Sequence, residues 1–290
     1  MLTSEYFAMD GALVLAVPTK LGQEFSFEEI EDGASIVHWK AYHQNALWLD
    51  AIIDYKNWKL LSTNIAKSGD FILKVLRNLQ YLSPCKFKSD TTYYLATNLQ
   101  FPANYGLGSS STLMTNLAEW GCCNPFELNA MSLGGSGYDI AVAKEKSAVL
   151  FRNKPELYIQ KVNFNPDFKD ELIFIHLNQK QDSREGIKLY RSKEKSQNLI
   201  SFFEKLTMDV LESDSIEKFS HLMGVHEKKI SNFIGIPTVK EKLFIDCPVF
   251  LKSLGAWGGD FVMSRKFDDY QNWFSDRGFS TIYSWSELID

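Results

Sequence analysis

Two glycines and three serines stand together at Gly106, Gly108 and residues 109–111, immediately before a stretch with helical spacing. The first turn of a helix presents backbone N–H groups without intrahelical partners, together with a partial positive charge. Glycines before such a turn let the backbone approach a ligand closely, and phosphate fits this arrangement. The hydroxyls of Ser109, Ser110 and Ser111 could donate to phosphate oxygens, and one of them could reach a Mg²⁺ ion.

This segment differs from two common phosphate-binding loops. No Lys follows the second glycine, as a Walker P-loop requires, and Ser111 stands where a dinucleotide fingerprint has its third glycine. Taken alone, the pair Gly106 and Gly108 is better explained by a serine-capped helix that follows a glycine turn.

A second glycine cluster, "LGGSGYDIAVA", places Asp139 directly after Ser136 and Gly137. A carboxylate fixed near a phosphate site can orient Mg²⁺ or accept a proton from an acceptor hydroxyl. An aspartate that caps a helix would give the same pattern.

A third cluster, "SLGAWGGDFVM", carries Gly255, Gly258 and Gly259 between apolar runs. A tight turn between two elements would explain it alone. Three such clusters in one chain with 17 glycines together favour a ligand site over three unrelated turns.

The elements that would position these residues alternate along the chain. Strands are predicted at 11–18, 25–30, 34–42 and 91–99, because apolar residues there form a short buried run or alternate with polar ones. Residues 45–58 are ambiguous between strand and helix. Residues 66–82 predict an amphipathic helix, and further helices are expected at 111–121, 125–133, 197–223 and 225–233. The mixture indicates the α+β class.

Length and composition predict one large or two modest domains. The chain has 290 residues, and the charged segment "NPDFKD" places a soft boundary near residue 165, which gives 1–165 and 166–290. The net charge of −5, with acids and bases mixed, argues against a nucleic-acid partner. The apolar run 12–17 is too short for a signal peptide or a membrane span. We therefore expect a soluble, cytoplasmic monomer or homodimer without a membrane partner, whose four cysteines are buried and reduced.

The three glycine clusters resemble the motifs of a known family. "PANYGLGSSST" resembles the second motif of the GHMP kinases (galactokinase, homoserine kinase, mevalonate kinase, phosphomevalonate kinase), which is usually P-x-x-x-G-L-G-S-S-A. "GSGYDIAVA" is similar to the segment with the family's active-site aspartate, and "SLGAWGGDFVM" to its glycine-rich third motif. "SEYFAMDGALVLAVP" resembles the later part of the first motif. The order and spacing agree over nearly the whole chain.

Three details resemble the phosphomevalonate kinases within this family. Tyr6 follows Glu5 where mevalonate kinases and galactokinases show GEH, residues 135–139 are similar to GSGFD, and residues 258–260 match the GGD of the third motif. The resemblance therefore implies an acceptor of the mevalonate pathway, while "GGSGYDIA" suggests a small branch that has its own acceptor.

The chain also departs from the family pattern. The strand P-G-K-[VL]-x-[LI] that precedes the first motif is cut short at Met1, so its lysine is absent. Ser4 and Trp257 replace usual glycines. The family's Mg²⁺-binding glutamate has no clear counterpart, with Glu127 only loosely aligned. These departures leave a non-catalytic nucleotide-binding relative as an alternative.

The resemblance implies a two-domain kinase fold, with an N-terminal half like ribosomal protein S5 domain 2 and a ferredoxin-like C-terminal half. It implies ATP and Mg²⁺ as cofactors and a small-molecule substrate. Asp139 would be the catalytic residue and Ser110 the metal ligand. ATP phosphates would be bound by Gly106, Leu107, Gly108, Ser109, Ser110 and Ser111. The acceptor would be bound by Glu5, Tyr6, Ser136, Gly137, Gly255, Gly258 and Gly259.

Two questions stay open in the sequence. A phosphorylated acceptor needs cations, and Lys20, Arg152, Arg184 and Lys188 are the candidates, although each is also explained as a surface charge. A GHMP kinase of a sugar or of an amino-acid alcohol such as homoserine is the alternative enzyme. The five histidines show no metal-ligand spacing and receive no role.

Overall fold

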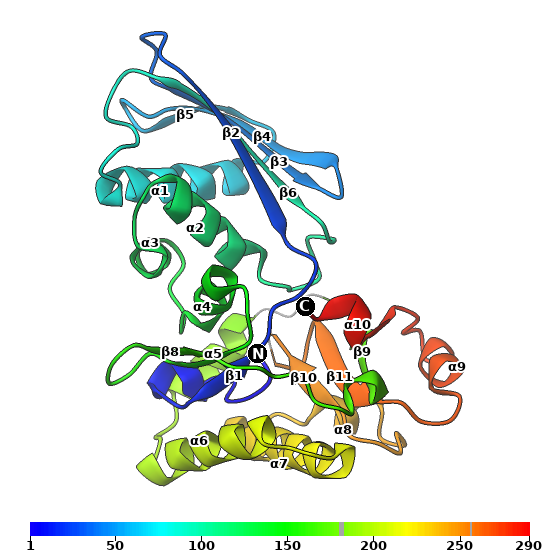
Figure 1. The fold of residues 1–290 in the computed structure, drawn as a ribbon. Coiled ribbons are helices and arrows are strands. Elements are labelled where there is room, and N and C mark those ends of the chain that lie inside the picture. Colours follow the sequence, from blue (N-terminus) through cyan, green and yellow to red (C-terminus); the bar gives the residue numbers. More distant parts are fainter. Residues whose placement is uncertain (180–182, 256) are drawn as a thin grey trace. The chain divides into compact units, whose positions relative to one another are not determined.

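The computed structural model describes residues 1–179, 183–255 and 257–290, with the backbone alone at 183–185. Helices and strands alternate throughout these residues, which confirms the α+β class (Figure 1). The chain forms two compact units, which are described separately. Unit 1 comprises Met1–Lys20, Asn104–Leu107 and Glu145–Asp290, and unit 2 comprises Leu21–Ala103 and Gly108–Lys144.

Unit 2 contains a five-stranded sheet in the order β2 (Gln23–Ile30), β6 (Thr92–Leu99), β3 (Ile36–His43), β4 (Ala46–Asp54), β5 (Lys59–Thr63). Strands β3 and β6 are parallel, and the other neighbours are antiparallel. Residues that were ambiguous in the sequence form β4, in which Leu49, Ala51 and Ile53 are buried at alternate positions. This period of two is the reason why the segment is a strand and not a helix.

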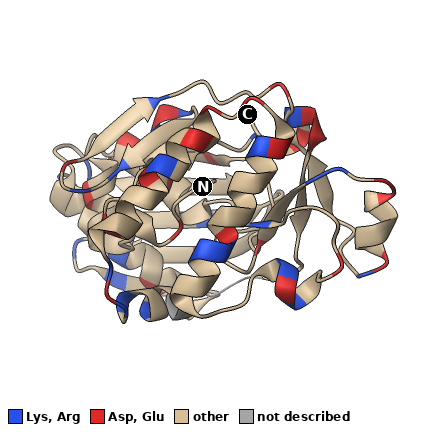
Figure 2. Cartoon of the chain, turned by 90° about the horizontal axis from the view of Figure 1, so that it is seen from below, with Lys and Arg blue, Asp and Glu red and all other residues tan. Residues whose placement is uncertain are grey.

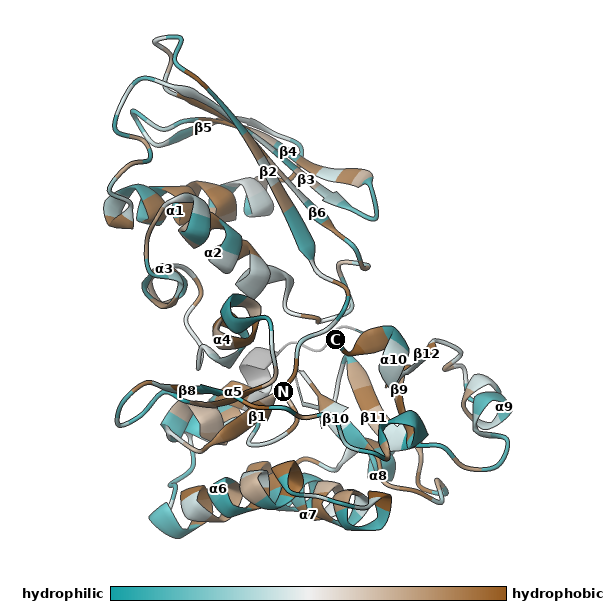
Figure 3. Cartoon of the chain, in the orientation of Figure 1, coloured by the Kyte–Doolittle hydropathy of each residue, from teal (hydrophilic) through white to brown (hydrophobic). Residues whose placement is uncertain are grey.

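Four helices complete unit 2: α1 (Ala66–Leu82), α2 (Ser109–Trp120), α3 (Pro125–Ser132) and α4 (Tyr138–Glu145). Brown and teal segments alternate along α1 in Figure 3, as its amphipathic pattern predicts. Its buried residues Ile72, Val75, Leu76 and Leu79 share one core cluster with Leu117 of α2 and with the inner face of the sheet. This core fixes the direction of α2, whose first turn carries the predicted phosphate-binding serines.

Unit 1 contains two further sheets. The three-stranded sheet has the order β1 (Val14–Ala16), β7 (Val149–Arg152), β8 (Tyr158–Lys161). The four-stranded sheet has the order β10 (Lys252–Leu254), β11 (Phe261–Arg265), β9 (Leu172–His176), β12 (Ile282–Ser284), and all its neighbours are antiparallel. The glycine-rich segment 255–260 therefore connects two adjacent, hydrogen-bonded strands.

The helices of unit 1 include two long ones, α6 (Gln197–Leu211) and α7 (Ile216–Ile234), which are drawn together in yellow in Figure 1. The shorter elements are η1 (Phe7–Asp10), η2 (Lys169–Glu171), α5 (Ser183–Arg191), α8 (Val239–Leu243), α9 (Tyr270–Ser275) and α10 (Trp285–Leu288). One face of α7 is buried, and this face includes His226 and Glu227 among apolar neighbours.

The break between α6 and α7 differs from the prediction. The sequence pattern placed it at Gly224, but the chain leaves the helix at 212–215 and Gly224 lies inside α7. The Ser213 hydroxyl donates to the Asp209 carbonyl oxygen at 2.9 Å, which ends α6 with a local side-chain bond. A single glycine within a helical pattern is tolerated, so Gly224 was wrongly interpreted as a helix stop.

The compact units do not coincide with the halves 1–165 and 166–290. Leu2 and Leu15, near the N-terminus, belong to the same buried cluster as Leu172 of β9 and Phe219 of α7. A hydrophobic cluster of this kind keeps its members in one folding unit. The first twenty residues are therefore part of unit 1, whereas 21–103 form most of unit 2.

The surface and the cysteines bear on the remaining expectations. Figure 2 shows acidic and basic residues interleaved along the helices. Among the described residues, no helix is both long and apolar enough to cross a bilayer. All four cysteines are free, but Cys85 and Cys122 are exposed, so the expected burial is wrong for these two. A hydrogen bond with Cys85 is the main reason why the pKa of Cys122 is raised.

Candidate functional site

The first turn of α2 has the geometry that the glycine-serine segment predicted. Gly108 is the N-cap residue in a left-handed conformation, with φ of 81°, and no atom would lie within 4 Å of a Cβ at this position. The N–H groups of Ser111 and Thr112 both donate to the Gly108 carbonyl oxygen at 3.0 Å. The Ser110 side chain is exposed at this turn. The Ser111 and Thr112 N–H groups are thus used within the turn, and the positive end of the helix presents the Ser109 and Ser110 N–H groups together with the Ser110 hydroxyl.

Asp139 meets this turn inside unit 2. The Ser111 hydroxyl donates a hydrogen bond to Oδ2 of Asp139, and the Ile140 N–H donates to Oδ1 at 3.1 Å. Asp139 stands in the first turn of α4 and is half-buried. The predicted proximity of the serine turn and the carboxylate is therefore present, although its catalytic role stays a prediction.

The third glycine cluster approaches Gly106 within unit 1. A Cβ at Gly106 would lie 2.0 Å from Oδ2 of Asp260, and Gly106 has a positive φ of 66°. A Cβ at Gly255 would lie 3.4 Å from the same oxygen and 3.8 Å from the Gly106 carbonyl oxygen. Glycine is thus required at Gly106 by both its conformation and the Asp260 side chain.

Glu5 lies in the interior of unit 1, with a relative exposure of 2%. Its Oε1 accepts a hydrogen bond from the Lys252 ammonium, and its Oε2 lies 3.0 Å from Nε2 of His226. Burial alone would raise the pKa of Glu5, but the charges and hydrogen bonds of Lys252 and His226 lower it to about 2. The carboxylate faces the Lys252 ammonium and the His226 imidazole inside unit 1, and its expected contact with the acceptor stays a prediction.

Tyr6 is only partly buried. Its ring stacks on the ring of Tyr190, with centroids 5.7 Å apart and planes at 18°. A Cβ at Gly186 of α5 would lie 2.0 Å from the Tyr6 hydroxyl oxygen. Burial, followed by the charges of Glu5 and Glu227, raises the pKa of Tyr6 to about 12. The phenol therefore keeps its proton and can donate a hydrogen bond.

The other predicted acceptor-binding and phosphate-binding residues are distributed over the same segments. Gly137 is buried with φ of 90°, and Ser136 beside it is half-buried. In unit 1, Gly259 is buried and Gly258 has φ of 89°. Leu107 packs against an apolar cluster of unit 1, so its side chain contributes to the core and only its backbone is available for a ligand.

Comparison with known proteins gives results at the level of structure alone. No protein-family model matches the chain, and no curated protein matches it. The structure of L. major mevalonate kinase in complex with R-mevalonate aligns with a TM-score of 0.67 at 13% identity, covering 98% of this chain and 91% of that one.

Two other solved structures align as extensively. Streptococcus pneumoniae phosphomevalonate kinase, in complex with phosphomevalonate and AMPPNP, has a TM-score of 0.67 at 16% identity and covers 98% of this chain and 96% of that one. Lactococcus lactis galactokinase with galactose has a TM-score of 0.65 at 13% identity, covering 98% and 90%. This chain has the GHMP kinase fold.

The four cationic side chains considered for binding a phosphorylated acceptor differ in their contacts and exposure. Lys20 donates to the Ser286 carbonyl oxygen at 2.7 Å, and Arg152 forms an ion pair with Glu204 at 3.2 Å. Lys188 is exposed on α5, and the Arg184 side chain lies outside the described residues. Among the candidates whose side chains the structure describes, Lys20 and Lys188 are exposed.

Glu127, the loosely aligned metal ligand, lies at the wrong end of α2. Its charge raises the pKa of Cys123, which follows the C-terminus of that helix, although burial is the larger cause. Helix α2 has 12 residues and is therefore about 18 Å long. Glu127 cannot share a metal ion with Ser110 from this position.

Sequence reasoning missed three residues of the GHMP kinase fold. Lys252 and His226 contact Glu5, Glu227 contacts Lys252 in turn, and all three are buried. One signal was available: His226 and Glu227 interrupt the apolar face of α7, where neighbouring core positions are Met223 and Ile230. Ionisable residues on a buried face need partners, which the sequence alone does not identify.

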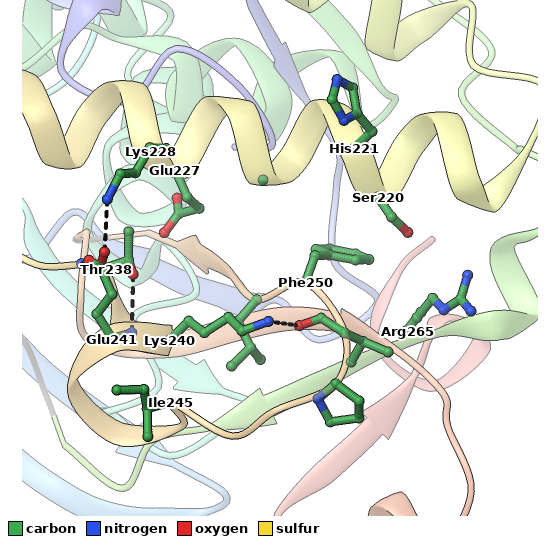
Figure 4. A pocket seen from close by; sticks show the side chains of 14 residues that line it. Ser220, His221, Glu227, Lys228, Thr238, Lys240, Glu241, Ile245, Phe250 and Arg265 are labelled. Atoms are coloured by element: carbon green, nitrogen blue, oxygen red, sulfur yellow. Dashed lines mark hydrogen bonds and ion pairs between the residues drawn. The ribbon is translucent and has the colours of Figure 1, made fainter.

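A separate cavity of about 570 Å³ lies in unit 1 between α7, α8 and the segment before β10. Figure 4 shows Glu227 projecting from α7 toward this cavity, opposite Lys240. Lys240 donates to the Val249 carbonyl oxygen at 2.7 Å, and Lys228 pairs with Glu241 at 2.9 Å. The residues that line the cavity include none of the predicted site residues, so it is distinct from the glycine-rich segments.

Proposed function

We propose that this chain is an ATP-dependent small-molecule kinase, which transfers the γ-phosphoryl group of MgATP to phosphomevalonate or mevalonate. The observation that carries the proposal is the hydrogen bond between Ser111 and Asp139 at the N-terminus of α2. It joins a phosphate-binding type of helix terminus to a half-buried carboxylate, and phosphoryl transfer needs both.

The proposed mechanism relies on positioning and on charge neutralisation. Backbone amides of the first turn of α2 hold the terminal phosphates of the nucleotide, and the exposed Ser110 hydroxyl donates to one of their oxygens. Asp139 is fixed by two hydrogen bonds, so its orientation needs no reorganisation during the reaction. With an alcohol acceptor, Asp139 accepts the hydroxyl proton. With a phosphate monoester, the attacking oxygen is already ionised and Asp139 orients the reacting groups.

The oxygen donors near the first turn of α2 suit Mg²⁺. This ion is commonly bound by one or two protein oxygens together with substrate phosphates and waters. The Ser110 hydroxyl and the Asp139 carboxylate are donors of this type. When bound, Mg²⁺ would neutralise charge on the phosphates.

The choice of acceptor rests on the motifs Glu5-Tyr6, 135–139 and 258–260, which resemble those of phosphomevalonate kinases. The alignment with the Streptococcus pneumoniae phosphomevalonate kinase is compatible with this choice. A galactokinase aligns nearly as well, so a sugar or an amino-acid alcohol such as homoserine is the second candidate. A nucleotide-binding protein without turnover is the third, because Trp257 stands where the third motif usually has glycine.

A coupled ADP-release assay separates these three functions. Phosphomevalonate, mevalonate, galactose and homoserine are each offered with MgATP, and nucleotide binding is measured in parallel by calorimetry. We expect ADP release that depends on phosphomevalonate or mevalonate. Release with galactose or homoserine alone would transfer the assignment to the second candidate. Nucleotide binding without release for any acceptor would support the third.

A further inference from the structure

Four ionisable side chains form a buried cluster in unit 1, which we call the Lys252 cluster: Glu5, His226, Glu227 and Lys252. Lys252 is 0% exposed and each of the others is at most 3% exposed. The ammonium donates to Glu5 and lies 3.4 Å from Oε1 of Glu227. It is therefore shared between two carboxylates that come from distant parts of the chain.

The first carboxylate belongs to a turn with unusual backbone angles. Ser4 and Tyr6, on either side of Glu5, both have φ of 65°, although neither is glycine. Such residues persist only where surrounding interactions hold them. The Ser4 N–H donates to Nε2 of His226 at 2.9 Å, and the Glu5 side chain is held by Lys252. The Lys252 cluster therefore maintains the turn that presents Tyr6.

The second carboxylate holds the glycine-rich segment after β10. Oε2 of Glu227 accepts from the Ser253 hydroxyl at 3.0 Å, and Oε1 accepts from Nε1 of Trp257 at 3.1 Å. These bonds fasten the chain on both sides of Gly255, which approaches Asp260 and Gly106. Trp257, where the family usually has glycine, thus has a specific partner in this chain.

We propose that Lys252 is a positioning residue for the acceptor site. Its buried ammonium bridges Glu5 and Glu227, and this bridge holds the Tyr6 turn in a fixed position relative to Ser253 and Trp257. The proposal rests on the proposed kinase function, and it assigns acceptor affinity to a lysine that contacts neither acceptor nor nucleotide.

The simplest alternative is that Lys252 only balances buried charge. Lys252→Met leaves two carboxylates with too little positive charge, so this variant should be strongly destabilised under either hypothesis. Two charge-matched double variants separate the hypotheses: Glu5→Gln with Lys252→Met, and Glu227→Gln with Lys252→Met. Each removes the ammonium together with one acid. Lys240→Met, which removes another partly buried lysine bonded to a backbone carbonyl, is the matched control.

If Lys252 positions the acceptor site, the double variants should recover stability but not acceptor affinity. Both double variants should melt well above the single Lys252→Met variant, because the charge is again balanced. Both should nevertheless raise the KM for the acceptor about tenfold, with a smaller change in the KM for ATP. Wild-type KM values in both double variants would overturn the proposal. An increase only in the variant with Glu5→Gln would also overturn it, because Glu5 itself would then contact the acceptor.

A measurement without turnover separates failure of this proposal from failure of the proposed function. Tryptophan labelled with ¹⁵N gives one indole signal per residue, and Trp257→Phe identifies the signal of Trp257. In the variant with Glu5→Gln and Lys252→Met, this signal should shift, although Trp257 and its partner Glu227 are both unchanged. An unshifted signal would refute the bridge. A shifted signal in a protein without any kinase activity would retain the bridge and reject the proposed function.

Discussion

At the scale of single residues, Ser111 and Asp139 have different roles in the proposed reaction. The proposal places Asp139 beside the reacting groups, and the buried Ser111 donates a hydrogen bond to its carboxylate. Removal of a group that transfers a proton costs more than removal of the group that orients it.

Asp139→Ala should lower kcat about a hundredfold, and Ser111→Ala should lower it about tenfold. Steady-state ADP release with the preferred acceptor measures both. Thr115→Val is the control, because the Thr115 hydroxyl donates to the Ser111 carbonyl oxygen one turn further along α2 and does not touch Asp139. A loss of less than tenfold for Asp139→Ala would remove this residue from the mechanism.

Glu5 makes a testable contribution to acid stability. Its pKa falls from 4.5 to about 2 on folding, so its contribution is complete above about pH 4.5 and is lost as the pH falls toward 2. Wild-type protein should therefore lose a few kcal/mol of unfolding free energy through this group on acidification. Glu5→Gln should be less stable at neutral pH and should show a flatter decline between about pH 4.5 and about pH 2.

Urea unfolding at a series of pH values measures this slope. Glu217→Gln is the control, since Glu217 pairs with Arg265 at the surface and its side chain is 75% exposed. Equal slopes for wild type and Glu5→Gln would show that folding does not lower the pKa of Glu5.

The four cysteines differ in solvent exposure, so they should also differ in reactivity. Burial raises the pKa of Cys247, which is 4% exposed, and burial followed by Glu127 raises the pKa of Cys123 to about 11. In native protein, a maleimide reagent should modify Cys85 and Cys122 before Cys123, and Cys247 only after unfolding. Peptide mass spectrometry identifies the modified residues, and early labelling of Cys247 would contradict the packing around it.

At the scale of elements, the loop before α2 depends on glycine to different degrees. Gly108→Ala introduces a left-handed alanine into open space and should cost about 1 kcal/mol. Gly106→Ala adds a clash with Asp260 and should cost about 1 to 3 kcal/mol more. Urea unfolding of Gly106→Ala, Asp260→Ala and the double variant should show that the second change relieves part of the first. Strict additivity would mean that the two residues are not in contact.

The helices and strands also show which parts of the fold the sequence alone could predict. Alternation predicted β3 and β6, and a helical apolar stripe predicted α1, because each pattern records one buried face. The serine turn and Asp139 were predicted together because motif order carried information that local pattern lacks. The Lys252 cluster could not be predicted, because nothing in the sequence distinguishes a lysine that forms an ion pair in the core from a lysine on the surface. The buried partners of Glu5 could not be predicted for the same reason.

At the scale of the whole molecule, the two units predict which fragments can fold. The buried cluster of unit 2 runs from Val37 to Ile140 and contains no residue of unit 1. A fragment of residues 21–144 should therefore fold, with helical circular dichroism and a cooperative thermal transition. A fragment of residues 166–290 should not, because its core lacks Leu2, Leu15 and Leu150. A disordered 21–144 fragment would show that unit 2 needs the remainder of the chain.

The sequence distance between Glu5 and Lys252 has a consequence for biosynthesis. A ribosome makes Lys252 247 residues after Glu5, which takes roughly 10 to 50 seconds at ordinary elongation rates. Residues 21–144 can collapse during that interval, before the Glu5 carboxylate has its partner Lys252. Unit 1 can therefore close around this ion pair only near the end of translation.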